Sequence, residues 1–177
     1  MQKRNSGFTL IELMLAIAIA AVLFSVAAPS MHELLQRQRI TATANELVAH
    51  INQARLHAVT RREIAVICPS QDGATCTGSN RWEDGWIVFR DPNRDGKPEG
   101  SGDVLRVGSG MENLLIDSAG RTRIRYQPSG AASGTNLTIK LCDQRTPEQS
   151  RAVIVSNPGR PRVADVPPHL SCPGFGV

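Results

Sequence analysis

The chain has 177 residues, of which 41% are hydrophobic, and it carries a formal net charge of +4. This length is enough for one modest globular domain beside an apolar segment, and one such domain is the expectation. Much of the hydrophobic share lies in one N-terminal run, so the rest is expected to be a single water-facing domain.

Residues 8–28 form that apolar run, in which every residue is apolar or small except Thr9, Glu12 and Ser25. About 20 such residues in a helix cross a hydrocarbon core of roughly 30 Å, so the run predicts one membrane-spanning helix. Lys3 and Arg4 precede it. By the positive-inside rule the N-terminus is then cytoplasmic, and the following domain lies on the other side of the membrane.

Glu12 is the charged exception inside this run. A carboxylate within a bilayer costs several kcal/mol unless a partner neutralises it, so Glu12 is a candidate functional residue. Lys3 and Arg4 lie in the water-side flank and do not share its face. A cleaved secretory signal ending near Ala28 and a plain signal anchor are alternative explanations of the run, but neither accounts for Glu12.

Lys3-Arg4 followed by Gly7-Phe8-Thr9-Leu10-Ile11-Glu12-Leu13 resembles the leader and N-terminus of type IV pilins and type II secretion pseudopilins. The resemblance implies a leader over residues 1–7, cleavage by a prepilin peptidase between Gly7 and Phe8, and N-methylation of Phe8. It also implies an assembly role for Glu12. The new amino group of Phe8 in one copy can pair with Glu12 of a neighbour, so burial in the membrane favours assembly with other pilins.

The next segment, residues 29–62, is predicted to be the periplasmic, amphipathic half of the same helix. Residues 30–63 contain no glycine or proline, and six apolar residues recur there at steps of three and four, which places them in one helical stripe. The stripe consists of Ile40, Ala44, Leu47, Ile51, Ala54 and Ala58. A coiled coil is the alternative, but alanine dominates the stripe and the repeat is short, so packing on a sheet is favoured.

From residue 63 onwards the pattern alternates with a period of two. Seven short segments rich in β-branched residues are separated, for the most part, by glycine, proline, asparagine or aspartate. They are residues 64–68, 86–89, 104–107, 114–116, 122–127, 137–142 and 152–155. The predicted fold class is α+β, with one antiparallel sheet or two small sheets in a head over residues 63–177. The pilin resemblance implies the same arrangement of a long N-terminal helix packed on an antiparallel sheet.

Four cysteines lie in the head, which the predicted topology places in an oxidising compartment. They allow three pairings, and the sequence alone does not choose between them. We favour Cys68 with Cys76 and Cys142 with Cys172, because each pair closes a local loop and the second fastens a proline-rich C-terminal segment. The tight spacing of a zinc site is absent.

Asp91-Pro92-Asn93-Arg94-Asp95-Gly96 has the first half of a calcium-binding EF-hand loop. Asp91, Asn93 and Asp95 supply oxygens at positions 1, 3 and 5, but position 12 is Gly102 instead of glutamate. Such a cluster is also typical of a plain turn. Calcium is the weaker interpretation, and no other cofactor is expected.

Charge is unevenly distributed over the head. Residues 72–117 contain nine acids and five bases, whereas residues 119–177 contain three acids and eight bases. Arg121-Thr122-Arg123-Ile124-Arg125-Tyr126 predicts a strand with its three arginines on one face. Asn157-Pro158-Gly159-Arg160-Pro161-Arg162 predicts a turn that directs two arginines outward, and guanidinium groups suit phosphate.

Two segments of the head resemble the GspH/FimT branch of minor pilins, which includes FimU-like subunits. Residues 82–91 are similar to its central hairpin, and residues 159–162 match a Gly-Arg-x-Arg motif implicated in DNA binding by FimT-type subunits. The resemblance implies DNA binding by Arg160 and Arg162. Few aromatic residues accompany the arginines, so double-stranded DNA is expected to be bound through its backbone and independently of sequence. Arg121, Arg123 and Arg125 are added to this site from charge and spacing alone. A solvated basic turn that protects a strand edge is the alternative.

No catalytic constellation stands out in the sequence. His32, His50 and His57 are expected on the surface of the helix, and neither they nor His169 have the spacing of a metal or nucleophile site. The sequence therefore predicts a minor pilin that enters the initiating or tip complex of a type IV pilus and displays a basic surface for DNA during natural transformation. A GspH-like minor pseudopilin of a type II secretion system and an anchored periplasmic domain of unrelated function are the alternatives.

Overall fold

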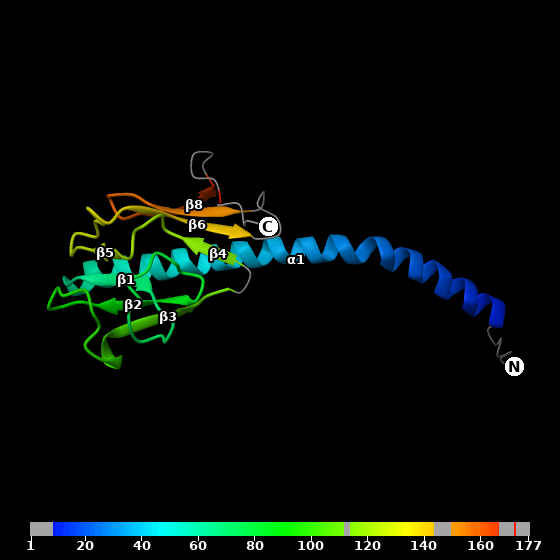
Figure 1. Ribbon diagram of the computed structural model, residues 1–177, viewed down its shortest axis with the longest axis horizontal. Coiled ribbons are helices and arrows are strands. Elements are labelled where there is room, and N and C mark those ends of the chain that lie inside the picture. The colour runs from blue at the N-terminus through cyan, green and yellow to red at the C-terminus, as the bar shows by residue number, and fades with distance from the viewer. Residues whose placement is uncertain (1–8, 112–113, 144–149, 167–171, 173–177) are drawn as a thin grey trace, which may run out of the picture. The chain divides into compact units, whose positions relative to one another are not determined.

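A computed structural model describes residues 9–111, 114–143, 150–166 and 172 (Figure 1). Helix α1 (Leu10–Arg61) begins in the first of two compact units, Met1–Gln38, and ends in the second, Arg39–Val177. No helix within the described residues is both long enough and apolar enough to cross a membrane, so the span predicted for residues 8–28 is not confirmed.

The first turn of α1 is closed by Thr9. Its hydroxyl Oγ1 accepts a hydrogen bond from the backbone N–H of Glu12 at 3.3 Å, and its carbonyl accepts one from the N–H of Leu13 at 3.2 Å. This is an N-cap, which satisfies one of the free N–H groups of the first turn. The side chain of Glu12 is exposed in that turn, where the helix dipole favours a carboxylate.

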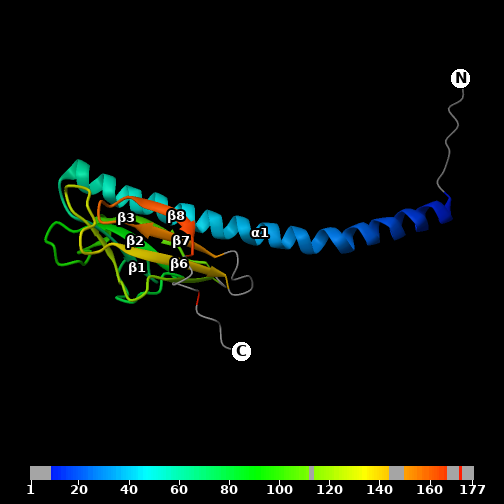
Figure 2. The same ribbon diagram turned by 90° about the horizontal axis from the view of Figure 1, so that it is seen from above.

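The second unit contains two four-stranded antiparallel sheets in its described residues. The first sheet, in the order β3-β2-β1-β5, comprises β3 (Val104–Ser109), β2 (Gly85–Arg90), β1 (Ala65–Pro69) and β5 (Ile124–Tyr126). The second, in the order β4-β6-β7-β8, comprises β4 (Leu114–Asp117), β6 (Leu137–Asp143), β7 (Arg151–Val155) and β8 (Pro161–Asp165). A short 3-10 helix, η1 (Ser101–Asp103), precedes β3. Strands of both sheets lie along the C-terminal part of α1 (Figure 2).

The helical stripe predicted from the sequence lies in the core. All six of its residues are at most 1% exposed, and they join a cluster with residues of both sheets, among them Val88, Ile139 and Val153. Three of the six are alanines, which allow the helix backbone to approach the strands closely. The α+β fold class and the packing of the helix on sheets are confirmed.

Two expectations about strands are wrong. Residues 122–127 contain only the three-residue strand β5, and β8 begins at Pro161, where the sequence was interpreted as a turn through Arg162. Among the described strands, β8 pairs with β7 alone, and proline is tolerated as the first residue of an edge strand. The sequence signal for strand β8 is weak, since Val163 is its only β-branched residue.

Both favoured disulfides are present, Cys68–Cys76 and Cys142–Cys172, each with a Cα–Cα distance of 5.7 Å. Cys142 is at most 1% exposed, so the second bridge anchors Cys172 to the interior of the second sheet.

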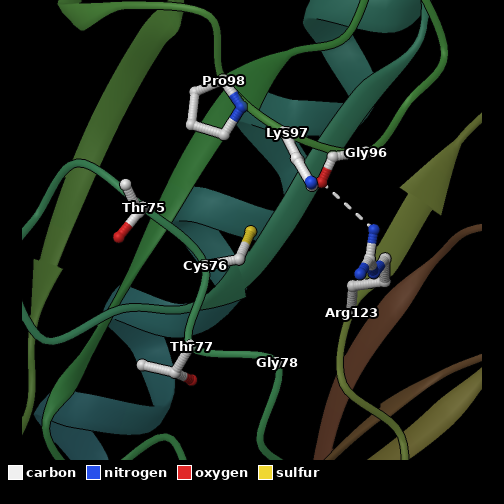
Figure 3. Close-up of a pocket in the computed structure, with 8 residues that line it drawn as sticks. All are labelled: Thr75, Cys76, Thr77, Gly78, Gly96, Lys97, Pro98 and Arg123. Atoms are coloured by element: carbon white, nitrogen blue, oxygen red, sulfur yellow. Dashed lines mark hydrogen bonds between the residues drawn. The ribbon is translucent and has the colours of Figure 1, made fainter.

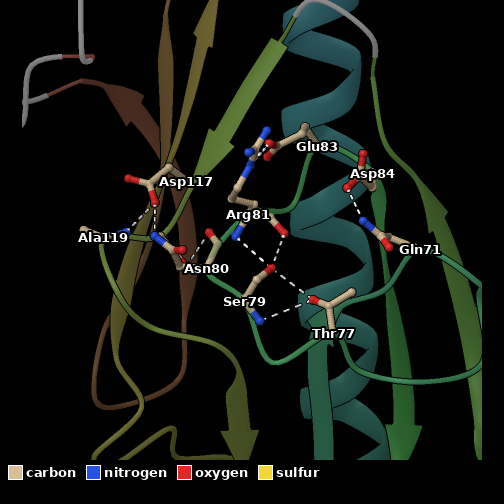
Figure 4. Close-up of polar contacts among 10 residues, drawn as sticks. Gln71, Thr77, Ser79, Asn80, Arg81, Glu83, Asp84, Asp117 and Ala119 are labelled. Carbon is tan, nitrogen blue, oxygen red and sulfur yellow. Dashed lines mark hydrogen bonds and ion pairs between the residues drawn. The ribbon is translucent and has the colours of Figure 1, made fainter.

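The long connection between β1 and β2 is also held by side-chain hydrogen bonds (Figure 4). Asn80 donates its Nδ2–H to Asp117 at 2.6 Å, and Gln71 donates to Asp84 at 2.8 Å. Within the same connection the Thr75 hydroxyl and the backbone N–H groups of Thr75 and Ala74 donate to Asp72. These hydrogen bonds, that of the Thr75 hydroxyl first, hold the pKa of Asp72 well below its ordinary value.

His50 is half-buried, which differs from the surface position expected for it. The fully buried Trp86 donates its indole N–H to Nδ1 of His50 at 3.0 Å, and the two rings meet edge to face at 6.1 Å. Burial lowers the pKa of His50 below 6.5. Glu46 opposes this shift, and Arg106 adds to it. In the neutral imidazole of His50 the unprotonated Nδ1 accepts the hydrogen bond from Trp86.

We expect the free energy of unfolding to fall as the pH drops below about 6.5, the ordinary pKa of histidine. Because the pKa of His50 is lower in the folded state, its contribution is complete above the unfolded pKa and is lost as the pH falls through the folded pKa. Urea unfolding at several pH values between 7.5 and 5 measures this slope. His50→Gln, which keeps an acceptor but does not titrate, should have a shallower slope, and an equal slope in both proteins would contradict the prediction.

Candidate nucleic-acid interface

The site that the sequence predicts for DNA is built on the turn before β8. Gly159 closes this turn by donating its N–H to the carbonyl of Ser156 at 2.7 Å. Its φ is +81°, in the left-handed region that favours glycine. A Cβ at this position would lie 2.2 Å from the carbonyl oxygen of Gly130 and 2.8 Å from Cε1 of Tyr126. The positive φ and the lack of room for a Cβ therefore both require glycine at this position.

Hydrogen bonds from β5, from α1 and from residue 132 hold the turn and the neighbouring Gly130 in place. The buried Tyr126 hydroxyl donates to the carbonyl of Gly159 at 2.9 Å, and Arg55 of α1 donates its Nε–H to the carbonyl of Gly130 at 2.9 Å. The N–H of Ala132 donates to the carbonyl of Asn157 at 3.0 Å. Burial raises the pKa of Tyr126 against a small opposing effect of Arg55, so the hydroxyl stays a donor. The turn is thus tied to β5 and to the helix.

Arg160 follows Gly159 at the end of this turn and Arg162 lies in β8, and both side chains are exposed. Among the residues that the structure describes, neither guanidinium group has an ion pair or a hydrogen bond. Arg162 lies opposite Ile154 in the register of β8 and β7. Side chains alternate along a strand, and the neighbours Val153 and Val155 are in the core, so Arg162 points away from it.

Arg121, Arg123 and Arg125 have partners within the head. Arg121 donates to the carbonyl of Gly134 at 2.9 Å, and Arg123 donates to that of Gly96 at 3.1 Å. Arg125 forms an ion pair with Asp91 at 3.3 Å. Arg121 and Arg123 precede β5, so the predicted strand with three arginines on one face is wrong in extent. A role of these three residues in DNA binding stays a prediction.

The loop considered for calcium, residues 91–96, is contacted by Arg123 and Arg125. The carboxylate of Asp91 is fully buried and accepts hydrogen bonds from the N–H of Gly96 at 3.2 Å, besides its ion pair with Arg125. Asn93 donates to Glu99 at 2.7 Å, and Asp95 accepts from the N–H of Lys97 at 2.8 Å. Within the described residues, no group of three or more His, Cys, Asp or Glu side chains is placed to hold a metal ion.

Sequence reasoning missed the cap at Thr9 and the support beneath Gly159. The first had a signal, because Thr9-Leu10-Ile11-Glu12 fits the threonine-x-x-glutamate pattern of a capping box. The second had none, since Arg55, Tyr126 and Gly130 are far from Gly159 along the chain. Gly7 and Phe8, the predicted processing residues, lie outside the described residues.

Comparison with known proteins identifies the family. Residues 43–159 match the family described as type II transport protein GspH, and residues 2–28 match the prokaryotic N-terminal methylation motif. The chain belongs to the GspH family. No curated protein matches the chain. Membership of this family of pilin structural components implies a membrane-anchored pilus component that assembles with other pilins after processing by a prepilin peptidase.

Two crystal structures of the type IV minor pilin FimU of Pseudomonas aeruginosa, strain PAO1, are similar to this GspH-family chain. In one crystal form the TM-score is 0.55 at 21% identity, covering 70% of this chain and 91% of FimU. In the other the TM-score is 0.56 at 21% identity, covering 76% and 92%. At this identity the likeness shows the fold, which is the pilin-like arrangement described above.

Proposed function

We propose that this GspH-family chain is a minor pilin of a type IV pilus that binds the phosphate backbone of double-stranded DNA during natural transformation. The binding surface is residues 159–162, which join the turn at Gly159 to the start of β8 and are called the basic turn. The observation that carries the proposal is that Arg160 and Arg162 are exposed and unpaired in the described part of the chain, on a turn fixed from below by Tyr126.

A fixed turn favours phosphate binding. Each guanidinium group presents a planar fork of N–H donors that can engage two phosphate oxygens. Because the backbone beneath it is already ordered, less conformational entropy is lost on binding than in a free loop. Contacts of this kind carry no base information, so binding is independent of sequence and weakens steeply with salt.

The double substitution Arg160→Gln and Arg162→Gln is expected to weaken duplex binding about tenfold and to flatten the slope of log K against log [salt] by up to about two. Fluorescence anisotropy of a labelled duplex with the full-length chain in detergent, at salt concentrations from about 50 to 200 mM, measures both quantities.

The matched control is Arg61→Gln with Arg106→Gln, which removes the same net charge from two exposed residues outside the basic turn. Its affinity should stay within about twofold of the unmodified chain. If the two double variants lose affinity equally, net charge and not the basic turn is responsible. Unchanged affinity in the Arg160 and Arg162 variant would show that the basic turn does not bind DNA.

Assembly is proposed to proceed through the N-terminal segment. Residues 8–28 are inserted in the inner membrane with the N-terminus cytoplasmic and the head periplasmic, and the amino group of Phe8 pairs with Glu12 of a neighbouring subunit in the initiating or tip complex. The match of residues 2–28 to the methylation motif and the exposed position of Glu12 support this arrangement. No catalytic step is assigned to the chain.

A minor pseudopilin of a type II secretion system is the second candidate, because the matching family carries the description type II transport protein GspH. Deletion of the gene distinguishes the two. We expect loss of transformation, with twitching also lost if the subunit is needed to initiate the fibre, and unchanged protein secretion. Loss of secretion with normal twitching and transformation would instead identify a pseudopilin.

A further inference from the structure

A cavity of about 430 Å³ lies where three separate segments of the head meet (Figure 3). One wall is the end of the Cys68–Cys76 loop, residues 75–78, and a second is residues 96–98. Arg123, which precedes β5, closes the third side. This volume falls within the range of about 300–1,000 Å³ that is usual for small-ligand sites.

The charged side chains that line the cavity are both cations, Lys97 and Arg123. In the part of the chain that the structure describes, neither side chain has an ion pair. Arg123 is half-buried and its position is fixed, because its Nη1 donates to the carbonyl of Gly96 at 3.1 Å. Lys97 is exposed, and its ammonium group is carried on a flexible four-carbon chain.

The acids nearest in sequence to the cavity walls have hydrogen-bond or ion-pair partners other than the side chains of Lys97 and Arg123. Asp72 accepts hydrogen bonds from Thr75 and Ala74 within its own turn, and Asp91 is paired with Arg125. Asp95 accepts from the backbone N–H of Lys97, and Glu99 accepts from Asn93. The two cations therefore lack a neutralising partner in the cavity, which is the electrostatic condition for binding an anion.

We propose that this cavity binds a phosphate-bearing anion between Arg123 and Lys97. The guanidinium group supplies fixed, directional donors, and the lysine supplies a mobile point charge that can close over the ligand. The phosphate comes either from the backbone of DNA, in which case the inference rests on the proposed function, or from a free phosphorylated small molecule.

Isothermal titration of the full-length chain in detergent with inorganic phosphate and with deoxyadenosine monophosphate, at constant ionic strength, tests the proposal. Lys97→Gln and Arg123→Gln should each weaken binding of both probes at least fivefold. Arg94→Gln is the matched control, because Arg94 is exposed in the same loop but does not line the cavity. Its affinity should be unchanged.

The Lys97 variant is decisive, because Arg123 also holds Gly96 and its loss can disturb the loop. Absence of phosphate binding by the unmodified chain, or equal affinity in Lys97→Gln, would overturn the proposal. Arg61→Gln with Arg106→Gln removes two exposed arginines that belong neither to the cavity nor to the basic turn, and it should leave phosphate affinity unchanged.

Duplex DNA identifies the source of the phosphate. If Lys97→Gln weakens duplex binding as well as phosphate binding, the source is the DNA backbone. If the unmodified chain binds phosphate through Lys97 but does not bind duplex, the ligand is a free phosphorylated molecule. The proposed DNA binding is then contradicted, and the cavity proposal stands. If duplex binding depends on Arg160 and Arg162 while phosphate does not bind, the cavity proposal fails and the proposed function stands.

Discussion

Gly159→Ala is expected to lower the free energy of unfolding by about 3 kcal/mol, the sum of left-handed backbone strain and the damage to one buried hydrogen bond. At a φ of +81° the alanine Cβ would lie 2.2 Å from a backbone carbonyl, which cannot move as a flexible side chain can. Relief of the clash moves Gly159 away from Gly130 and lengthens the hydrogen bond from Tyr126. Urea unfolding measures the loss.

Gly134→Ala is the matched control for this substitution. Gly134 has a φ of +75°, but a Cβ there meets no atom within 4 Å, so the variant reports the cost of the backbone conformation alone, about 1–2 kcal/mol. The difference between the two variants is the steric cost beneath the basic turn. If Gly159→Ala is no more destabilised than Gly134→Ala, the turn is not supported as the structure indicates.

Arg125→Met is expected to destabilise the head by about 3 kcal/mol, because it leaves the charge of Asp91 buried without a counter-ion. Asp91 is fully buried, and after the substitution its remaining hydrogen-bond donor among the described residues is the N–H of Gly96. Methionine fills a similar volume, so lost packing contributes little. Chemical unfolding of the single variant measures the effect.

The double variant Arg125→Met with Asp91→Asn supplies the control. An asparagine at position 91 is neutral, so most of the lost stability should return. A double variant as unstable as Arg125→Met alone would show that packing of the arginine stem, and not the buried charge, is responsible. The same pair tests whether Arg125 acts as a structural residue, since its removal should then affect DNA binding only through stability.

Much of the fold follows from local patterns. The apolar steps from Ile40 to Ala58 identify the buried face of α1, since a helix presents every third or fourth residue on one side. Most strands follow from alternation and turn residues in the same way. Strand β8 does not, because its apolar residues are few and it is fixed by pairing with β7.

The candidate site follows from the sequence only in part. The motif around Gly159 identified two arginines that are exposed, but it gave no sign of Tyr126 or Arg55 beneath them. The alternation of Arg121, Arg123 and Arg125 predicted one strand face, but only Arg125 lies in β5. Asp91, Gly96 and Gly134 reach those arginines only through folding.

Residue types and their spacing were sufficient for the α+β class, the buried helical stripe and the family resemblance, because each depends on neighbours in the chain or on a repeating period. The two disulfide pairs were only favoured from the sequence, and the structure decided them. Folding alone settled which arginines remain free for a ligand and which are paired inside the head. The reason is that a guanidinium group donates hydrogen bonds to whatever acid or carbonyl lies within a few ångströms, and such partners are set by how the two sheets and the helix pack.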